Sequence, residues 1–355
     1  MNLSISEKID LFAALGKVLR TYSENTREAK LEAYYRILDN KLPLAEEQNP
    51  WFTRKNILHA LQNMGIALEK SKIEYWISQY PTLKEKKYNP LKIGVVNAGN
   101  IPFVGFHDFI TILITGNLYY GKLSSKDKEL PKAIRDILLK MEPSMNDNII
   151  FENHILKNFD AIIATGSDNT SRYFEYYFGK YPHIIRKNRS SAAILTGDET
   201  DEDLRKMADD IFLYFGLGCR NISKIYIPQE FSFNRLFENI SHYEEALKQH
   251  NKYMNNYEYN RIIYLMNQTP HLDNGFLLLK EDKALSSPVG TLFYEKYTDL
   301  KKLDDYFSLH KDNIQCLISK SEQIYDAIDF GKAQIPELWE YADNVDTIKF
   351  LSSLQ

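Results

Sequence analysis

An excess of basic charge is missing from this sequence of 355 residues, in which 44 Lys and Arg stand against 48 Asp and Glu. Proteins that hold nucleic acid or lie on anionic membranes use a strongly positive surface, which a formal net charge of −4 does not supply. We therefore expect no nucleic-acid partner. An anionic ligand would have to be held by a few local groups.

Long hydrophobic runs are also missing. The least polar stretches, Ile93–Phe106 and Phe109–Gly121, contain glycine and asparagine and are shorter than the ~20 apolar residues that a membrane helix requires. The N-terminus carries Glu7, Lys8 and Asp10 where a signal peptide would have an apolar core. We expect a protein that does not span a membrane and has no export signal.

Cysteine is scarce, with only Cys219 and Cys316 in the chain. Two cysteines build neither a disulfide framework nor a zinc site by themselves, so we expect no bound metal and a reducing, cytoplasmic location. Glycine and proline are few as well, at 15 and 12 residues, while 44% of the residues are hydrophobic. This composition indicates a globular chain with a sizeable core.

The spacing of apolar residues divides the chain into a helical part and an alternating part. From Ile5 to about Tyr80, apolar residues recur at helical spacing, which predicts a helical lead-in. After Asn89-Pro90, short apolar runs such as "KIGVVNAG" and "DAIIATGS" alternate with amphipathic stretches, and this rhythm predicts βαβ units with mostly parallel sheets. The segment "SAAILTG" reads as the last strand of this series.

The length is that of about two domains, and a second alternating series begins near Thr200. A polar, proline-bearing seam lies near residues 182–200. We therefore predict a helical segment over 1–85, two α/β domains over 86–190 and 191–335, and a C-terminal segment over 336–355.

The first candidate site lies in "DAIIATGSDNTSRYFEYYF", residues 160–178. A buried strand ends at Thr165-Gly166-Ser167 and a helix follows, so the backbone can approach a ligand at Gly166 while the helix N–H groups point at it. The alternative is an ordinary serine N-cap on a strand-to-helix turn.

The second candidate lies in "NAGNIPFVGFHDF", residues 97–109. Asn100 stands at a strand-to-helix transition, where its amide could donate a hydrogen bond to a developing oxyanion. Alternatively, Asn100 caps the helix and Pro102 is its first residue, and both readings can hold at once. Lys122 and Ser124 follow the next strand and could bind a phosphate or a ribose. The alternative is that they are solvated side chains at a strand end, which are equally common.

The third candidate is Cys219 in "FLYFGLGCRNISKIYIP", residues 212–228. A cysteine beside glycine sits on tightly turned backbone, and the adjacent Arg220 would favour the thiolate, which is the nucleophilic form. The alternative is a buried packing cysteine, which is our interpretation of Cys316.

Together these segments resemble the aldehyde dehydrogenase superfamily, and within it the acyl-CoA reductases of the LuxC type. The resemblance covers about residues 90–330 and rests on the order N-x-P, K-x-S, T-G-S and G-x-x-C. It implies an α/β, aldehyde dehydrogenase-like fold with two Rossmann-like domains, the cofactor domain over 86–190 and the catalytic domain over 191–335. Asn100 would match the family's oxyanion asparagine, and Cys219 its nucleophile.

The resemblance also implies a nicotinamide cofactor. Lys122 matches the lysine that meets the adenosine ribose or the 2′-phosphate of NADP, with Ser124 close by in the sequence. Gly166 and Ser167 match the pair at the cofactor pyrophosphate. We expect NADPH, with NADH as the alternative.

Two departures from the family pattern bear on the reaction. The late E-x-F-G-P-V segment is reduced to Pro288-Val289, so its glutamate is not visible. Arg186 stands about where ordinary aldehyde dehydrogenases carry the glutamate that activates water. Without that base, hydrolysis of a cysteine thioester loses the ~10²–10⁴-fold that general-base catalysis supplies. An acyl-enzyme would then survive to meet coenzyme A or hydride.

We therefore expect reduction of an acyl-CoA, of the fatty acyl type, to an aldehyde through an acyl-Cys219 intermediate, with coenzyme A as part of the substrate. A CoA-acylating aldehyde dehydrogenase working in the opposite direction would use the same residues. A non-catalytic nucleotide- or acyl-binding subunit is the alternative from a different class. A homo-oligomer and a complex with an acyl-transferring enzyme both stay open.

Overall fold

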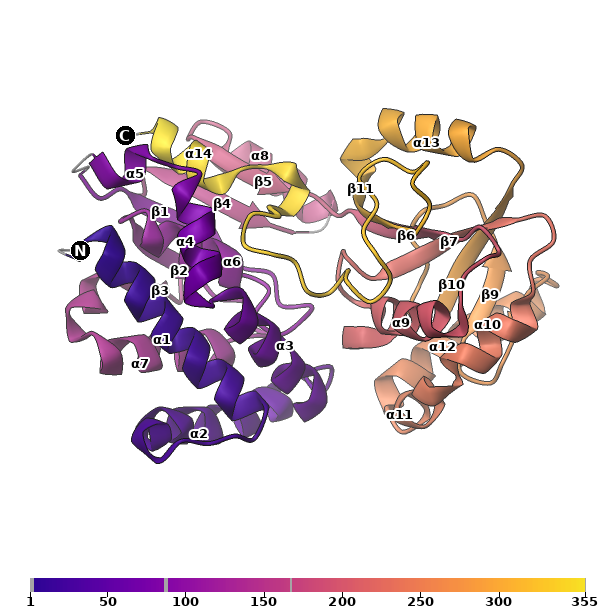
Figure 1. Ribbon diagram of the computed structural model, residues 1–355, viewed down its shortest axis with the longest axis horizontal. Helices are drawn as coiled ribbons and strands as arrows, with labels where there is room; N and C mark the ends of the chain where they lie inside the picture. Colours follow the sequence, from indigo (N-terminus) through magenta and orange to yellow (C-terminus); the bar gives the residue numbers. More distant parts are fainter. Residues whose placement is uncertain (1–2, 86–88, 167, 355) are drawn as a thin grey trace. The chain divides into compact units, whose positions relative to one another are not determined.

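The computed structural model describes residues 3–85, 89–166 and 168–354, which form two compact units. Unit 1 consists of Met1–Lys187 together with Glu337–Gln355, and unit 2 consists of Asn188–Pro336 (Figure 1). The chain therefore passes into unit 2 once and returns, so residues 337–355 are part of unit 1. None of the described helices is both long and apolar enough to cross a membrane.

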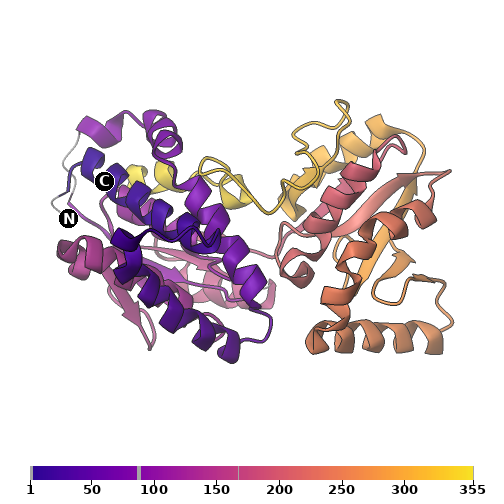
Figure 2. The same cartoon turned by 60° about the horizontal axis from the view of Figure 1, so that its bottom comes forward.

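The predicted helical lead-in is confirmed. It consists of α1 (Ile5–Ser23), α2 (Glu32–Gln48), α3 (Arg54–Ala67), α4 (Lys70–Ser78) and α5 (Thr82–Glu85). Helix α1 begins with a capping box, in which Ser4 and Glu7 satisfy each other's backbone N–H groups. Helices α1 and α3 approach closely where both carry glycine. A Cβ on Gly65 would lie 2.7 Å from the backbone nitrogen of Arg20, so a larger residue does not fit there. The helices gather on one side of unit 1 (Figure 2).

Unit 1 contains a five-stranded sheet in the order β3-β2-β1-β4-β5, and every neighbouring pair is parallel. Its elements are β1 (Lys92–Val96), α6 (Phe106–Ile114), β2 (Leu118–Lys122), α7 (Glu129–Met141), β3 (Ile149–Glu152), β4 (Ala161–Thr165), α8 (Asp168–Phe178) and β5 (His183–Arg186). The central strands β1, β2 and β4 follow the predicted runs. The short edge strands β3 and β5 were not predicted, because each has only four residues and an apolar run of three or two.

Unit 2 contains a six-stranded sheet in the order β11-β6-β7-β10-β9-β8, parallel except for the β8–β9 pair. Its elements are β6 (Ser190–Ile194), α9 (Asp201–Phe212), β7 (Ile222–Pro228), α10 (Phe233–Ile240), α11 (Glu244–Lys248), α12 (Asn251–Met266), β8 (Leu272–Asp273), β9 (Leu278–Glu281), β10 (Thr291–Tyr297), α13 (Leu300–Leu309) and β11 (Ile314–Ile318). The α/β fold class with parallel sheets is thus confirmed.

The rhythm of apolar runs grouped the strand in "SAAILTG" with the first series, which is wrong, although the predicted boundary at 190/191 places these residues in the second domain. This strand forms β6, which pairs with β7 and β11 of unit 2. Strand periodicity predicts that a strand exists, whereas its partners are set by pairing with residues far away in the sequence.

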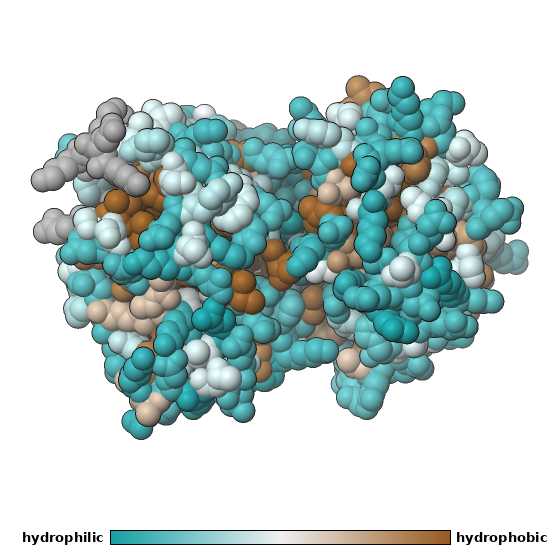
Figure 3. Space-filling model, in the orientation of Figure 1, coloured by the Kyte–Doolittle hydropathy of each residue, from teal (hydrophilic) through white to brown (hydrophobic). Residues whose placement is uncertain are grey.

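The returning C-terminal segment docks on the helical side of unit 1. Its last helix, α14 (Thr347–Ser353), packs against α6. Trp76 Nε1 donates a hydrogen bond to the Tyr341 hydroxyl at 2.7 Å, and Lys72 forms an ion pair with Glu337 at 2.6 Å. The face of the protein seen in Figure 3 is mostly hydrophilic, with hydrophobic residues in small groups.

Candidate active site

Three parallel strands of unit 1 end at the same edge of the sheet and bring the predicted cofactor residues to that edge. Val96 of β1 pairs with Lys122 of β2 on one side and with Ala164 of β4 on the other. Asn100, Lys122 and Gly166 therefore all follow or end neighbouring strands. The carboxyl edge of such a sheet, at the point where the strand order reverses, is where open α/β proteins bind ligands.

The loops after β1 and β2 are tied directly to each other. The Asn97 N–H donates to the Lys122 carbonyl at 3.1 Å. A Cβ on Gly99 would lie 2.4 Å from Ser124 Oγ, so only glycine allows this contact. The segment that carries Asn100 thus adjoins the segment that carries Ser124, a proximity that their spacing in the sequence does not reveal.

Asn100 is exposed in the loop before α6 and does not cap that helix. Helix α6 begins at Phe106, its N-cap is Gly105, and no side chain caps it. The alternative reading, in which Asn100 caps the helix and Pro102 is its first residue, is therefore wrong. The physical reason is Phe103, whose φ of 58° turns the backbone into the left-handed region between Pro102 and the helix.

Gly166 follows β4, and its N–H donates to the Arg186 carbonyl at 3.3 Å. A Cβ here would lie 2.9 Å from the Phe174 ring and 3.0 Å from Thr170, both on α8. Close packing of α8 against the strand end therefore requires glycine at this position. Ser167, its predicted partner at the pyrophosphate, lies outside the described residues.

Arg186, which we expected at the position of the family's glutamate, is buried at the end of β5. Its guanidinium forms an ion pair with Asp108 of α6, with Nη2 and Oδ1 2.8 Å apart. Burial disfavours the ionised carboxylate, but the guanidinium outweighs that effect and holds the pKa of Asp108 below its ordinary value. The arginine and its partner are thus an interior ion pair of unit 1.

Cys219 is the exposed cysteine of the chain, and it lies in a turn between the short 3₁₀ helix η3 (Leu213–Gly216) and β7. Its carbonyl accepts a hydrogen bond from Ser191 Oγ at 2.9 Å. Cys316, in β11, is only half-buried, and its Sγ lies 3.0 Å from the same serine oxygen. Neither cysteine is in a disulfide.

The backbone before Cys219 is strained. Tyr214 and Phe215 have φ values of 55° and 60°, in the left-handed region that bulky residues rarely adopt. Such conformations cost about 1–3 kcal/mol each and persist only where the surroundings hold them. One such support is His250, whose ring stacks on that of Phe215 at 4.0 Å between centroids.

Asn221 supports the turn through its side-chain hydrogen bonds, and the sequence alone did not identify it as a site residue. It is buried, its Nδ2 donates to the carbonyls of Asp210 at 3.0 Å and Leu213 at 2.9 Å, and its Oδ1 accepts from the Gly218 N–H at 2.8 Å. Asparagine in a Gly-Cys-Arg-Asn turn next to a strand was the available signal, since its side chain readily bonds local backbone.

Arg220 reaches away from the turn into a neighbouring loop. Its Nε donates to the Ala333 carbonyl at 2.5 Å, while the buried carboxylate of Asp210 accepts from the N–H groups of Gly331 at 2.6 Å and Ala333 at 3.0 Å. Burial raises the pKa of Asp210 to about 7, although both N–H groups and Arg220 oppose the shift. Arg220 therefore anchors the loop around residue 333.

Replacing Asn221 by alanine is expected to loosen the cysteine turn. The change leaves two buried carbonyls and the Gly218 N–H without their amide partner, which costs about 1–3 kcal/mol. Hydrogen exchange of the peptide covering 213–222 should then accelerate by about tenfold or more. Asn255→Ala, on an exposed face of α12, is the matched control. Unchanged exchange in Asn221→Ala would show that the turn does not depend on this side chain.

His107 is a structural residue of unit 1. Its Nε2 lies 2.8 Å from the Leu338 carbonyl, and its ring packs edge-on against Tyr341. Burial lowers the pKa of His107, so the ring is neutral at physiological pH. Among residues 3–85, 89–166 and 168–354, no three His, Cys, Asp or Glu side chains are gathered in a way that could hold a metal ion.

Comparison with known proteins identifies the family and the fold. A family model described as "Acyl-CoA reductase (LuxC)" matches residues 1–252. No curated protein matches the chain at a significant level.

Solved structures share the fold at low sequence identity. An oxidoreductase from Marinobacter aquaeolei has a TM-score of 0.62 and 10% identity, covering 90% of this chain and 75% of its own. An indole-3-acetaldehyde dehydrogenase from P. syringae, in complex with NAD+, has a TM-score of 0.62 and 12% identity, covering 92% and 74%. An NADP-dependent glyceraldehyde-3-phosphate dehydrogenase from Bacillus halodurans, complexed with NADP, has a TM-score of 0.58 and 14% identity, covering 92% and 78%. At such identities the likeness shows the aldehyde dehydrogenase-like fold alone.

Proposed function

The chain belongs to the LuxC family of acyl-CoA reductases, and from this premise we propose that it reduces a fatty acyl-CoA thioester to the aldehyde with NADPH, through an acyl-Cys219 intermediate. The family makes the protein an oxidoreductase of acyl-CoA and aldehyde chemistry. The thioester intermediate and the preference for NADPH are the parts that we propose.

The observation that carries the proposal is the exposure of Cys219 on a turn that several groups hold in place. The turn is fastened by Ser191 through the Cys219 carbonyl, by Asn221 through Gly218, and by Arg220 through Ala333. A buried packing cysteine needs no such arrangement, and a thiol held on a defined backbone meets an electrophile in a reproducible geometry.

In the proposed covalent step, the Cys219 thiolate forms a bond from Sγ to the carbonyl carbon of the acyl thioester. The tetrahedral oxyanion then collapses, the bond to the coenzyme A sulfur breaks, and coenzyme A leaves as the thiol after taking a proton. By the family resemblance, the Cys219 N–H and the amide of Asn100 are the proposed oxyanion donors. Removal of one oxyanion donor typically lowers kcat by ~10²–10³-fold.

The proposed cofactor-binding site is the carboxyl edge of the sheet in unit 1. The donor set there suits a dinucleotide phosphate, since Lys122 supplies a cation, Ser124 a hydroxyl, and Gly166 a strand end followed by a helix. Ser167 keeps its proposed role from the family resemblance. When bound, the reduced nicotinamide supplies the hydride that brings the acyl group to the oxidation level of an aldehyde.

Acyl-CoA-dependent oxidation of NADPH tests the proposed reaction. A panel of acyl-CoA thioesters of increasing chain length should give turnover with the longer chains, and intact-mass analysis without cofactor should detect one acyl adduct per chain. Rates measured in both directions separate a reductase from a CoA-acylating aldehyde dehydrogenase. A protein that binds acyl-CoA but forms neither adduct nor aldehyde would instead be a binding subunit.

Replacing Lys122 by alanine is expected to discriminate between the two cofactors. Loss of a charge-assisted contact to the 2′-phosphate should raise KM for NADPH about tenfold, while KM for NADH should change by less than about twofold. Lys140→Ala, at the exposed end of α7, is the matched control. Equal effects on both cofactors would mean that Lys122 does not meet the 2′-phosphate.

A further inference from the structure

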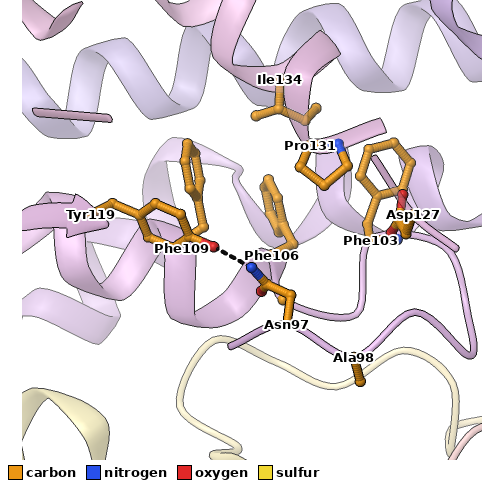
Figure 4. A pocket seen from close by; sticks show the side chains of 10 residues that line it. Asn97, Ala98, Phe103, Phe106, Phe109, Tyr119, Asp127, Pro131 and Ile134 are labelled. Carbon is orange, nitrogen blue, oxygen red and sulfur yellow. Dashed lines mark hydrogen bonds between the residues drawn. The ribbon is translucent and has the colours of Figure 1, made fainter. Parts of the chain in front are cut away.

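Unit 1 contains a small apolar pocket between the loop after β1 and the helices α6 and α7, drawn in Figure 4. Its enclosed volume is about 20 Å³, which is room for about one water molecule. Asn97 and Asp127 lie on its wall, and Asn97 Nδ2 donates to the Tyr119 hydroxyl at 2.8 Å, as the dashed line marks. The pocket is therefore a gap in the packing of unit 1 and has no room for a substrate.

In unit 2, the sheet is irregular on both sides of Ser191. Toward β7, the step from Ser191 to Ala192 passes two residues of the neighbouring strand, so Ser223 is an extra residue. Toward β11, two residues, Gln315 and Cys316, lie opposite Ser191 alone. Such an extra residue makes a β-bulge, which is rare between parallel strands and recurs next to active sites, where it aims a side chain. Ser191 is thus the residue at which two bulges meet.

The Ser191 hydroxyl makes all the hydrogen bonds of which it is capable. The side chain is fully buried, and its Oγ donates its single proton to the Cys219 carbonyl at 2.9 Å. The same oxygen accepts from the Cys316 N–H at 3.2 Å and lies 3.0 Å from the Cys316 thiol. Because the serine proton is already committed, the thiol is the donor in that contact.

The bond from Ser191 holds one of the two peptide groups that flank the Cα of Cys219. It fixes the carbonyl of the peptide between Cys219 and Arg220. The preceding peptide is held at its own carbonyl, because the Gly218 oxygen accepts the Asn221 N–H at 3.0 Å. Since each peptide group is planar, holding both planes fixes φ and ψ of Cys219, and with them the direction of its Cα–Cβ bond. The serine hydroxyl thus helps to set where the thiol points.

We propose that Ser191 is a positioning residue for the nucleophile, and that its hydroxyl aims the Cys219 thiol at the carbonyl carbon of the acyl thioester. This role rests on the proposed function, in which Cys219 is acylated. Ser191 acts through the backbone of the turn and makes no contact with the substrate. A displacement of about 1 Å at a reacting atom can slow a reaction about 10²-fold. Loss of the hydroxyl should therefore slow acylation while the thiol itself stays reactive.

The alternative is that Ser191 only stabilises unit 2, and Ser319 is the matched control for that alternative. Ser319 is buried at the other end of the same pair of strands. Its Oγ donates to the Ile194 carbonyl at 2.9 Å and accepts the Ser321 N–H at 3.2 Å. These bonds equal those of Ser191 in kind and length, but none of them holds Cys219. A purely structural serine at 191 would give the same result as Ser319 when replaced by alanine.

Acyl transfer from p-nitrophenyl acetate measures attack of the thiol on a carbonyl without coenzyme A or cofactor. In this step Sγ of Cys219 bonds to the acetyl carbon, the ester C–O bond breaks, and p-nitrophenolate leaves with the electron pair. Peptide mapping of the full chain follows the adduct at Cys219. We expect Ser191→Ala to lower the acylation rate about 30-fold or more, and Ser319→Ala to change it less than about threefold.

Alkylation of Cys219 by iodoacetamide provides the comparison. This small reagent reacts at a methylene carbon and forms no tetrahedral oxyanion, so it does not depend on how the thiol is aimed at a carbonyl. Its rate should stay within about threefold of the wild type in Ser191→Ala and in Ser319→Ala. Thermal unfolding confirms that each variant is folded.

Turnover with acyl-CoA gives a second readout. Ser191→Ala should lower kcat/KM for acyl-CoA about 30-fold or more, while KM for NADPH stays within about twofold, because the proposed cofactor residues lie in unit 1. Should Ser191→Ala not fold, Ser191→Thr and Ser191→Val replace it, since the two side chains have the same branched shape and only threonine keeps the hydroxyl. Threonine should then retain acylation within about threefold, and valine should show the loss.

The outcomes separate the role of Ser191 from the proposed function. Equal acylation rates in Ser191→Ala and Ser319→Ala, or alkylation that falls together with acylation, would overturn the positioning role. A wild type that is acylated by p-nitrophenyl acetate but never by acyl-CoA would overturn the proposed reductase, and the ester rates would then decide on Ser191 alone. A wild type that forms no acetyl adduct at Cys219 would overturn both.

Discussion

Cys219→Ala is expected to lower acyl-CoA-dependent oxidation of NADPH by about 10³-fold or more and to abolish the acyl adduct in intact-mass spectra. The proposed mechanism splits the reaction at a covalent thioester, and alanine offers no atom that can form it. Binding of acyl-CoA should persist, because the substitution removes one exposed sulfur atom and leaves the turn contacts of Ser191 and Asn221 in place.

The second cysteine provides the control for this experiment. Cys316→Ser keeps a hydroxyl next to Ser191 Oγ, where the thiol lies at 3.0 Å, and should retain nearly full activity and the adduct. An adduct that persists in Cys219→Ala but vanishes in Cys316→Ser would transfer the nucleophile to Cys316. Comparable turnover in Cys219→Ala and the wild type would remove the covalent mechanism altogether.

Asp108→Asn is expected to destabilise unit 1 by about 3–5 kcal/mol, because it leaves the buried guanidinium of Arg186 without its counter-charge. The double variant Asp108→Leu/Arg186→Met should lie closer to the wild type, since removal of both charges leaves no unpaired ion in the interior. A single variant as stable as the wild type would show that the pair adds nothing to the stability of the unit.

Urea unfolding followed by tryptophan fluorescence measures this effect selectively. The chain has three tryptophans, Trp51, Trp76 and Trp339, and all of them belong to unit 1. The change in tryptophan fluorescence therefore reports the unfolding of unit 1.

The difference in the free energy of unfolding between the wild type and Asp108→Asn depends on pH with a defined sign. The pKa of Asp108 is lower in the folded protein than its ordinary value of 3.8, so the stabilisation is fully present above that value. It is lost only as pH falls through the lower folded pKa. The gap between wild type and Asp108→Asn should thus stay constant across neutral pH and shrink only in strong acid.

The order of the motifs was sufficient to predict the family and the fold, because each predicted site residue stands next to an apolar run. Gly166 after β4, Lys122 at the end of β2 and Cys219 before β7 all follow this rule. Local patterns with periods of 2 and 3.6 residues carry this information, and they survive at low sequence identity.

Other features of the site depend on contacts between distant residues. Asn221 supports the cysteine turn through carbonyls of the preceding helix and 3₁₀ turn, and Arg220 anchors a loop more than a hundred positions away. The alternative reading of Asn100 as a helix cap failed because the left-handed backbone at Phe103 has no sequence signal, since the residue there is not glycine.

The sequence alone determined the family, the helical lead-in and the central strands of unit 1, because the patterns that predict them depend on neighbours along the chain. Only the tertiary structure decided that β6 joins the second sheet, that Gly99 lies against Ser124, and that Asp127 faces an apolar pocket. Sheet order and burial arise from pairing and packing between residues far apart in the chain, and hydrophobic periodicity does not encode which of those pairings is made.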